Sequence, residues 1–204
     1  MTRKRKHALD FHRRLPSHIW DSLADVGIVE SVVHAKLLGY DDPHLVVPIF
    51  ASHREIAFFE YWIETNRAFT LDVERTGSRS GLYGRELLRT APGQVVFCET
   101  SIDRLILISK GFAAVSLAGT QKKVDESWIG ELQRVKGLLV WASSSDSASC
   151  WVKQLVGRVP SARLVRSPSE GSLGSVVDFF ATGGRTRIDL VEMFRSNQTG
   201  DESE

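Results

Sequence analysis

The stretch that decides the fold runs from Gln94 to Phe112 and reads QVVFCETSIDRLILISKGF. It starts with a short apolar, β-branched run at 94–98, which predicts a strand buried on both faces. The pair Thr100-Ser101 can cap a following helix, whose apolar residues recur at helical spacing, and Gly111 can end that helix. A buried strand, a turn and a helix in this order are typical of an open α/β sheet.

Two carboxylates mark the end of this predicted strand. Glu99 follows its last apolar residue, and the carboxyl ends of strands are where open α/β sheets place their ligands. Asp103 comes four residues later, so one helical turn brings it back toward Glu99. Two neighbouring carboxylates repel each other unless a cation or a proton offsets the charge. The sequence therefore indicates a functional site at this position.

The remainder of the second half repeats the strand–helix alternation. This rhythm predicts an α/β fold with a mostly parallel sheet flanked by helices. Further strands are expected at 113–118, 137–142 and 162–166, and helices at 127–135, 147–157, 176–183 and 188–195.

The first half of the chain has a different pattern. Its apolar periodicity predicts helices at 16–27 and 31–38, strands at 45–50, 56–63 and 69–73, and a short helix that ends near residue 90. Pro48 indicates that the first of these strands is an edge strand, or that pairing breaks there. We therefore expect a small α+β subdomain at 10–91 and an α/β domain at 92–195, with a basic arm at 1–9 and a disordered acidic tail at 196–204.

Composition narrows the class of protein. The 204 residues include 42% hydrophobic and 25% charged side chains, as in ordinary soluble globular proteins, and no apolar run is long enough for a membrane span. The basic start, 1–6, lacks the apolar segment of a secretory signal. Cys98 and Cys150 are too few for a disulfide framework or a four-cysteine zinc site. These features predict a cytoplasmic protein.

Four carboxylates fall near the carboxyl ends of the predicted parallel strands. Because such ends meet at one edge of a sheet, they could form one acidic cluster, made of Glu99, Asp103, Asp146 and Asp178. Mg²⁺ uses a few carboxylates together with phosphate oxygens, so the cluster is consistent with metal-assisted phosphoryl transfer. The alternative is that these carboxylates only cap helices and turns at solvated loop ends.

A glycine-, serine- and arginine-rich loop at 75–81 suggests a second site. Arginine guanidinium groups match phosphates, and an aromatic ring can stack on a base. The candidate nucleic-acid-binding residues are Arg75, Arg79, Tyr83 and Arg85, with an ordinary solvated loop as the alternative. The arm at 1–9 also favours polyanions, unless it is simply a frayed terminus.

Several of these segments resemble a known family. The segment 96–104, with Glu99 and Asp103, resembles the first motif of the Toprim domain of bacterial DnaG-like primases. Three later segments look like its next strand, its Asp-x-Asp region and its third acidic motif, at 111–120, 138–155 and 176–180. Upstream, 15–40, 47–50 and 82–84 resemble the amino-terminal subdomain of the primase polymerase core. The resemblance covers that core and not the zinc-binding or helicase-binding domains.

The resemblance implies template-dependent RNA primer synthesis on single-stranded DNA during replication. It implies Glu99, Asp103 and Asp146 as catalytic residues, Glu99, Asp146 and Asp178 as ligands of Mg²⁺ or Mn²⁺, and single-stranded DNA, nucleotides and a helicase or separate zinc-binding protein as partners.

Three departures from the motifs leave alternatives open. Thr100 replaces the glycine after the glutamate, Ser144 replaces the first aspartate of the pair, and Ser175 or a neighbour replaces the first acid of the last motif. Serine cannot supply the charge of a carboxylate at a magnesium site. A non-catalytic nucleic-acid-binding accessory protein and a Toprim nuclease are therefore the alternatives.

Overall fold

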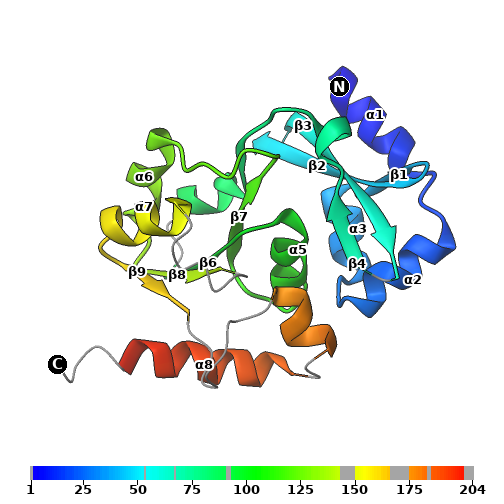
Figure 1. Ribbon diagram of the computed structural model, residues 1–204. Coiled ribbons are helices and arrows are strands. Elements are labelled where there is room, and N and C mark those ends of the chain that lie inside the picture. The colour runs from blue at the N-terminus through cyan, green and yellow to red at the C-terminus, as the bar shows by residue number, and fades with distance from the viewer. Residues whose placement is uncertain are drawn as a thin grey trace.

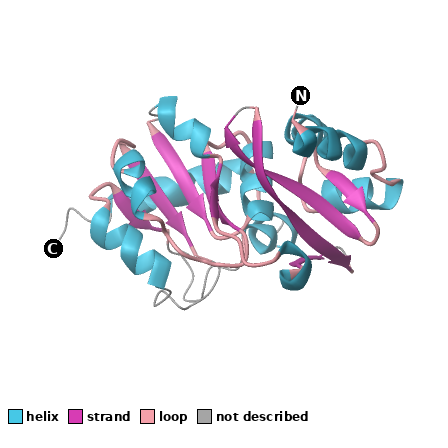
Figure 2. Ribbon diagram, turned by 90° about the horizontal axis from the view of Figure 1, so that it is seen from above, coloured by secondary structure: helices cyan, strands magenta, loops and turns pink. Residues whose placement is uncertain are grey.

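The computed structural model describes residues 2–52, 54–66, 68–90, 93–142, 150–165, 175–182 and 185–199. Two lobes lie side by side, each built around its own sheet (Figures 1 and 2). The N-terminal lobe runs from α1 to α4, and the C-terminal lobe runs from β5 to α8.

The N-terminal lobe has an antiparallel sheet in the order β1-β2-β3-β4. Three helices precede the sheet: α1 (Arg3–His12), α2 (Ser17–Asp25) and α3 (Glu30–Lys36). The strands are β1 (Gly39–Asp41), β2 (His44–Ser52), β3 (Glu55–Thr65) and β4 (Ala68–Leu71). This confirms the expected helices and strands, and it shows that most of the predicted basic arm is helical.

Pro48 lies where the pairing of β2 with its neighbouring strands changes. The pairing of β1 with β2 ends at Val46, so among the described residues Pro48 pairs with β3 alone, opposite Phe59. The register with β3 then shifts between Ile49 and Phe50. A proline without a backbone N–H is tolerated at such a locally one-sided position. The expected break in pairing is therefore confirmed.

The connection between the lobes differs in part from the prediction. The short helix α4 (Val73–Thr76) occupies the start of the expected loop, because the Asp72 side chain caps it by accepting from Arg75 N at 2.9 Å. Next come β5 (Gly81–Tyr83) and the 3₁₀ helix η1 (Arg85–Thr90).

The C-terminal lobe has a five-stranded sheet in the order β5-β7-β6-β8-β9. All pairs are parallel except β5 with β7, so a strand from before residue 92 joins this sheet. The four predicted strands are present: β6 (Gln94–Cys98), β7 (Ala114–Ala118), β8 (Gly137–Trp141) and β9 (Ala162–Leu164). The helical elements are α5 (Ser101–Ser109), α6 (Glu126–Leu132), α7 (Cys150–Arg158), the π-helical turn η2 (Asp178–Thr182) and α8 (Arg187–Thr199). The α/β fold class is confirmed. Because α8 extends to Thr199, residues 196–199 of the expected tail are helical.

Strand β6 lies in the middle of this sheet and is buried on both faces, as predicted. Phe97 belongs to a hydrophobic cluster within the C-terminal lobe. Val96 and Cys98 belong to a second core, which also contains residues of the N-terminal lobe, such as Leu23 and Val47. This shared core joins the lobes. In the described ranges, no helix is long and apolar enough to span a membrane.

Candidate nucleic-acid-binding and acidic sites at the junction of the lobes

Glu99 follows β6 at the carboxyl end of the sheet and is half-buried. The neighbouring strand β7 runs parallel to β6, with Cys98 opposite Ser116, so the loop after β7 lies beside Glu99. From this loop the Lys122 ammonium donates a hydrogen bond to the Glu99 carbonyl oxygen at 2.7 Å. A lysine therefore lies next to the predicted catalytic glutamate.

Asp103 lies in the first turn of α5 and is buried. Thr100 caps this helix, and its hydroxyl donates to Asp103 Oδ2 at 2.7 Å. The backbone N–H of Val176 donates to Oδ1 at 3.1 Å. Burial, opposed by these hydrogen bonds and reinforced by the nearby Glu99 carboxylate, raises the pKa of Asp103 to about 6. The predicted proximity of Asp103 to Glu99 is thus confirmed.

Asp178 is brought near this region by its own segment, because Val176 contacts Asp103. The Asp178 side chain, however, is exposed and takes part in a capping box with Ser175. Asp178 Oδ2 accepts from the N–H and the hydroxyl of Ser175, each at 2.8 Å, and Asp178 N donates back to the Ser175 hydroxyl at 3.1 Å. This is the capping role that the alternative interpretation predicted for Asp178.

The structure describes the predicted Mg²⁺ site only in part. Within the described ranges, no three His, Cys, Asp or Glu side chains come close enough to hold a metal ion. In the described part, both oxygens of Asp103 and one of Asp178 accept hydrogen bonds from the protein. Asp146 and Ser144 lie outside the described residues.

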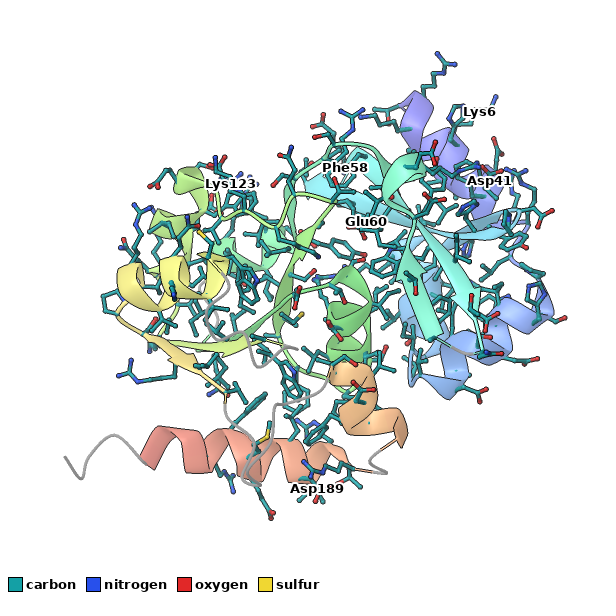
Figure 3. The ribbon with its side chains drawn as sticks, in the orientation of Figure 1. Lys6, Asp41, Phe58, Glu60, Lys123 and Asp189 are labelled. Atoms are coloured by element: carbon teal, nitrogen blue, oxygen red, sulfur yellow. The ribbon has the colours of Figure 1, made fainter. Side chains whose placement is uncertain are left out.

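Glu60 is a buried carboxylate at this junction that the sequence interpretation missed. It lies on β3 of the N-terminal lobe, and Figure 3 shows it in the middle of the molecule. Its carboxylate accepts from Ser101 Oγ and Gly119 N of the C-terminal lobe, and from Trp62 Nε1 at 3.1 Å. Burial raises the pKa of Glu60, although these donors oppose the shift. The sequence does carry a signal for Glu60: it is the single carboxylate inside the aromatic run 56–62.

The predicted arginine loop and the basic start of the chain meet at one pocket. Lys4 of α1, Arg75 of α4 and Arg79 line a pocket of about 260 Å³ together with three half-buried aromatic side chains of β3, Phe58, Phe59 and Tyr61. We call it the basic pocket. Arg75 lies 4.7 Å from the centre of the Tyr61 ring and pairs with Asp41. The pocket is a concave surface with cations and aromatic rings.

The basic pocket is attached to the loop after β7. Gln121 N donates to the Arg79 carbonyl at 3.0 Å, and the Thr120 hydroxyl donates to the Gly77 carbonyl at 2.9 Å. Gly119 has a φ of +84°, and the Arg79 backbone leaves no room for a Cβ atom there. The loop that carries Lys122 therefore also supports the basic pocket.

Two of the predicted nucleic-acid-binding residues do not line this pocket. Tyr83 is fully buried, with the Arg104 guanidinium 4.2 Å from its ring centre, which contradicts the expected stacking on a base. The Arg85 guanidinium forms a two-pronged ion pair with Glu131 of α6, at 2.9 and 2.8 Å. Tyr83 is buried because β5 pairs with β7, which places Tyr83 opposite Ser116 and in the hydrophobic core that the lobes share.

Comparisons with known proteins identify solved structures that share this architecture. No protein-family model and no curated protein sequence matches the chain. The zinc-binding and RNA polymerase domains of the Aquifex aeolicus primase superpose with a TM-score of 0.65 at 16% identity, over 94% of this chain and 59% of that one. A DnaG primase catalytic domain bound to ssDNA gives 0.59 at 12% identity, over 87% and 73%. The E. coli primase catalytic core gives 0.55 at 13% identity, over 92% and 78%. These likenesses confirm the predicted architecture: the chain has the fold of a DnaG-type primase catalytic core.

Proposed function

We propose that this chain binds single-stranded DNA, with the basic pocket as a principal binding surface. The observation that carries the proposal is the convergence of Lys4, Arg75 and Arg79 on a pocket lined by aromatic rings of β3. Single strands are bound by combining cations that follow the phosphates with rings on which bases stack. The primase fold supports the proposal, since one structure with this fold is of a catalytic domain bound to ssDNA.

The test is the affinity for a fluorescein-labelled oligothymidylate, measured by fluorescence anisotropy over a series of salt concentrations. The double variant Arg75→Ala/Arg79→Ala should bind roughly tenfold more weakly at 0.1 M salt, and its salt slope should fall by about 0.7 for each phosphate that it no longer neutralises. Lys153→Ala, which removes an exposed lysine from α7, is the matched control. Equal affinities of the double variant and this control would contradict the proposal.

Primer synthesis is the second candidate function. The position of Glu99 at the carboxyl end of β6, beside Asp103, favours it. The reaction would be template-dependent nucleotidyl transfer in replication, with Asp146 completing the acidic set, Mg²⁺ or Mn²⁺ as cofactor, and a helicase or separate zinc-binding protein as partner. The Bacteriophage T7 primase fragment, whose parent is a primase-helicase protein, has a related fold with a TM-score of 0.54.

A primer assay on a single-stranded template, with ribonucleotides and either metal, separates the two candidates. Template-dependent RNA product that is lost in Glu99→Gln supports primer synthesis. Shortening of the template instead of product formation identifies a nuclease. Binding without either reaction at high protein concentration identifies a non-catalytic accessory protein.

A further inference from the structure

Helix α8 borders a second pocket that combines cations with aromatic rings. The pocket has a volume of about 260 Å³ and is lined by Gln94, Phe112, Val191, Phe194 and Arg195. We call it the α8 pocket. Gln94 is the first residue of β6, and Phe112 shortly precedes β7. The pocket therefore lies at the amino ends of these two parallel strands, whereas Glu99 follows the carboxyl end of β6.

Two arginines of α8 supply positive charge at this pocket. Arg195 lines it, and the Arg187 guanidinium lies 5.4 Å from the centre of the Phe112 ring. Both arginines are exposed, and neither forms an ion pair with another described residue. In the basic pocket, by contrast, Arg75 pairs with Asp41. The described part of the chain thus leaves the charge of the α8 pocket available for a ligand.

The sequence of α8 separates its basic side chains from its acidic ones. Arg187, Val191 and Arg195 recur every four residues, so they share one flank of the helix, and two of them line the pocket. The carboxylates of α8, Asp189 and Glu192, fall two and five residues after Arg187 and therefore on another flank. The flank beside the pocket is consequently basic, which favours an anionic ligand.

We propose that the α8 pocket is a second nucleic-acid-binding site, which takes a nucleotide of a single strand. Single strands are bound by cations that neutralise phosphates and by aromatic rings on which bases stack. Arg187 and Arg195 supply the cations, the half-buried Phe112 supplies a ring, and the exposed Gln94 amide can donate to and accept from a base edge.

The α8 pocket is separate from the basic pocket. The two share no lining residue, and Figure 1 shows α8 on the opposite side of the molecule from α1, which carries Lys4 of the basic pocket. The two pockets therefore contact different segments of nucleic acid. The inference rests on the proposed binding of single-stranded DNA, but it concerns a different surface.

The test is fluorescence anisotropy with fluorescein-labelled oligothymidylate, in the parent and in the Arg75→Ala/Arg79→Ala background. Arg187→Ala/Arg195→Ala should weaken binding roughly fivefold at 0.1 M salt in both backgrounds. Its salt slope should fall by about 0.7 for each phosphate that is no longer neutralised. Arg134→Ala/Lys153→Ala removes the same charge from exposed positions, after α6 and on α7, and is the matched control.

The outcomes separate this inference from the proposed function. Equal affinities of Arg187→Ala/Arg195→Ala and the matched control, in either background, would overturn the inference and leave the basic pocket as the binding surface. A loss at α8 without a loss in Arg75→Ala/Arg79→Ala would support the inference and contradict the role of the basic pocket. A parent chain that does not bind oligothymidylate would contradict both. If the α8 double variant does not fold, Arg195→Ala, which removes one exposed side chain, is held to the same criteria.

Discussion

The basic pocket and the carboxylates buried where the lobes meet hold opposite charges in opposite environments. The N-terminal lobe presents exposed cations over half-buried aromatic rings at the basic pocket. The C-terminal lobe holds the Asp103 carboxylate out of water at the end of its parallel sheet, and the buried Glu60 of the other lobe accepts a hydrogen bond from Ser101, the first residue of the same helix. Exposed charges interact weakly with one another and are screened by salt, which leaves them available for a ligand. Buried charges affect stability directly, because the cost of desolvation must be offset within the protein.

The comparison predicts that mutations in the two regions affect different measurements. Removing a cation of the basic pocket should change DNA affinity and leave the free energy of unfolding almost unchanged. Removing a buried carboxylate, Glu60 or Asp103, should change the free energy of unfolding first. Glu60 is the sharpest case, because it belongs to the N-terminal sheet and yet bonds to the C-terminal lobe.

The largest expected effect is that of Glu60→Ala. The substitution leaves the Gly119 N–H, the Ser101 hydroxyl and the Trp62 indole N–H without their acceptor in a buried region. Each unsatisfied buried donor costs about 1–3 kcal/mol, so the free energy of unfolding should fall by roughly 3 kcal/mol or more. Urea unfolding measures this loss. Glu55→Ala, at an exposed position of the same strand, should cost about 0.5 kcal/mol or less.

A nearly unchanged free energy of unfolding in Glu60→Ala would contradict this comparison of the two regions. It would mean that the stability of the two lobes does not depend on this carboxylate. Glu60→Gln sharpens the test. The amide keeps one acceptor oxygen and the shape of the side chain, so its effect should lie between those of Glu60→Ala and the parent.

The second effect is a pH dependence that originates at Asp103. Its carboxyl group has a pKa of about 6 in the folded protein against an ordinary value of 3.8. The folded state therefore binds the proton more tightly than the unfolded state, and this group lowers stability as the pH rises from about 4 to above 6. The size of the effect is on the order of 2–3 kcal/mol.

Asp103→Asn removes this titration. Relative to the parent, the variant should gain stability between pH 5 and pH 8, as measured by urea unfolding at both values. Because other titrating groups are common to both proteins, only the difference between them matters. A constant difference across this range would show that Asp103 does not titrate there.

The sequence alone predicted much of this arrangement, for identifiable physical reasons. The run 94–98 has two apolar faces and specifies a central strand, and Thr100 caps α5 as expected. Glu60 was missed because its partners, Ser101 and Gly119, lie far along the chain, and local periodicity carries no information about such pairings. The capping role of Asp178 was open for the same reason: spacing cannot distinguish a capping carboxylate from a ligand.

A smaller effect is expected at Arg85. Its two-pronged ion pair with Glu131 links η1 to α6, but both side chains are partly exposed. Arg85→Ala should lower the free energy of unfolding by about 0.5–1 kcal/mol. A double-mutant cycle with Glu131→Ala measures the coupling. The loss of oligothymidylate affinity should be smaller than for Arg79→Ala, because the Arg85 guanidinium is already engaged within the C-terminal lobe; an equal loss would extend the DNA-binding surface to η1.

The smallest effect is expected at Tyr83, and it tests the comparison most directly. The hydroxyl of this buried residue has no hydrogen-bond partner among the described atoms, while its ring packs under the Arg104 guanidinium. Tyr83→Phe keeps the ring and removes an unsatisfied polar group, so the free energy of unfolding should stay within about 0.5 kcal/mol of the parent value or rise. Oligothymidylate affinity should be unchanged, because a fully buried ring cannot stack on a base. Tyr61→Leu is the matched contrast, since its ring lines the basic pocket and its removal should weaken binding by roughly 1 kcal/mol or more. If instead Tyr83→Phe weakened DNA binding while Tyr61→Leu did not, the division between an exposed basic pocket and buried side chains that act only on stability would be wrong.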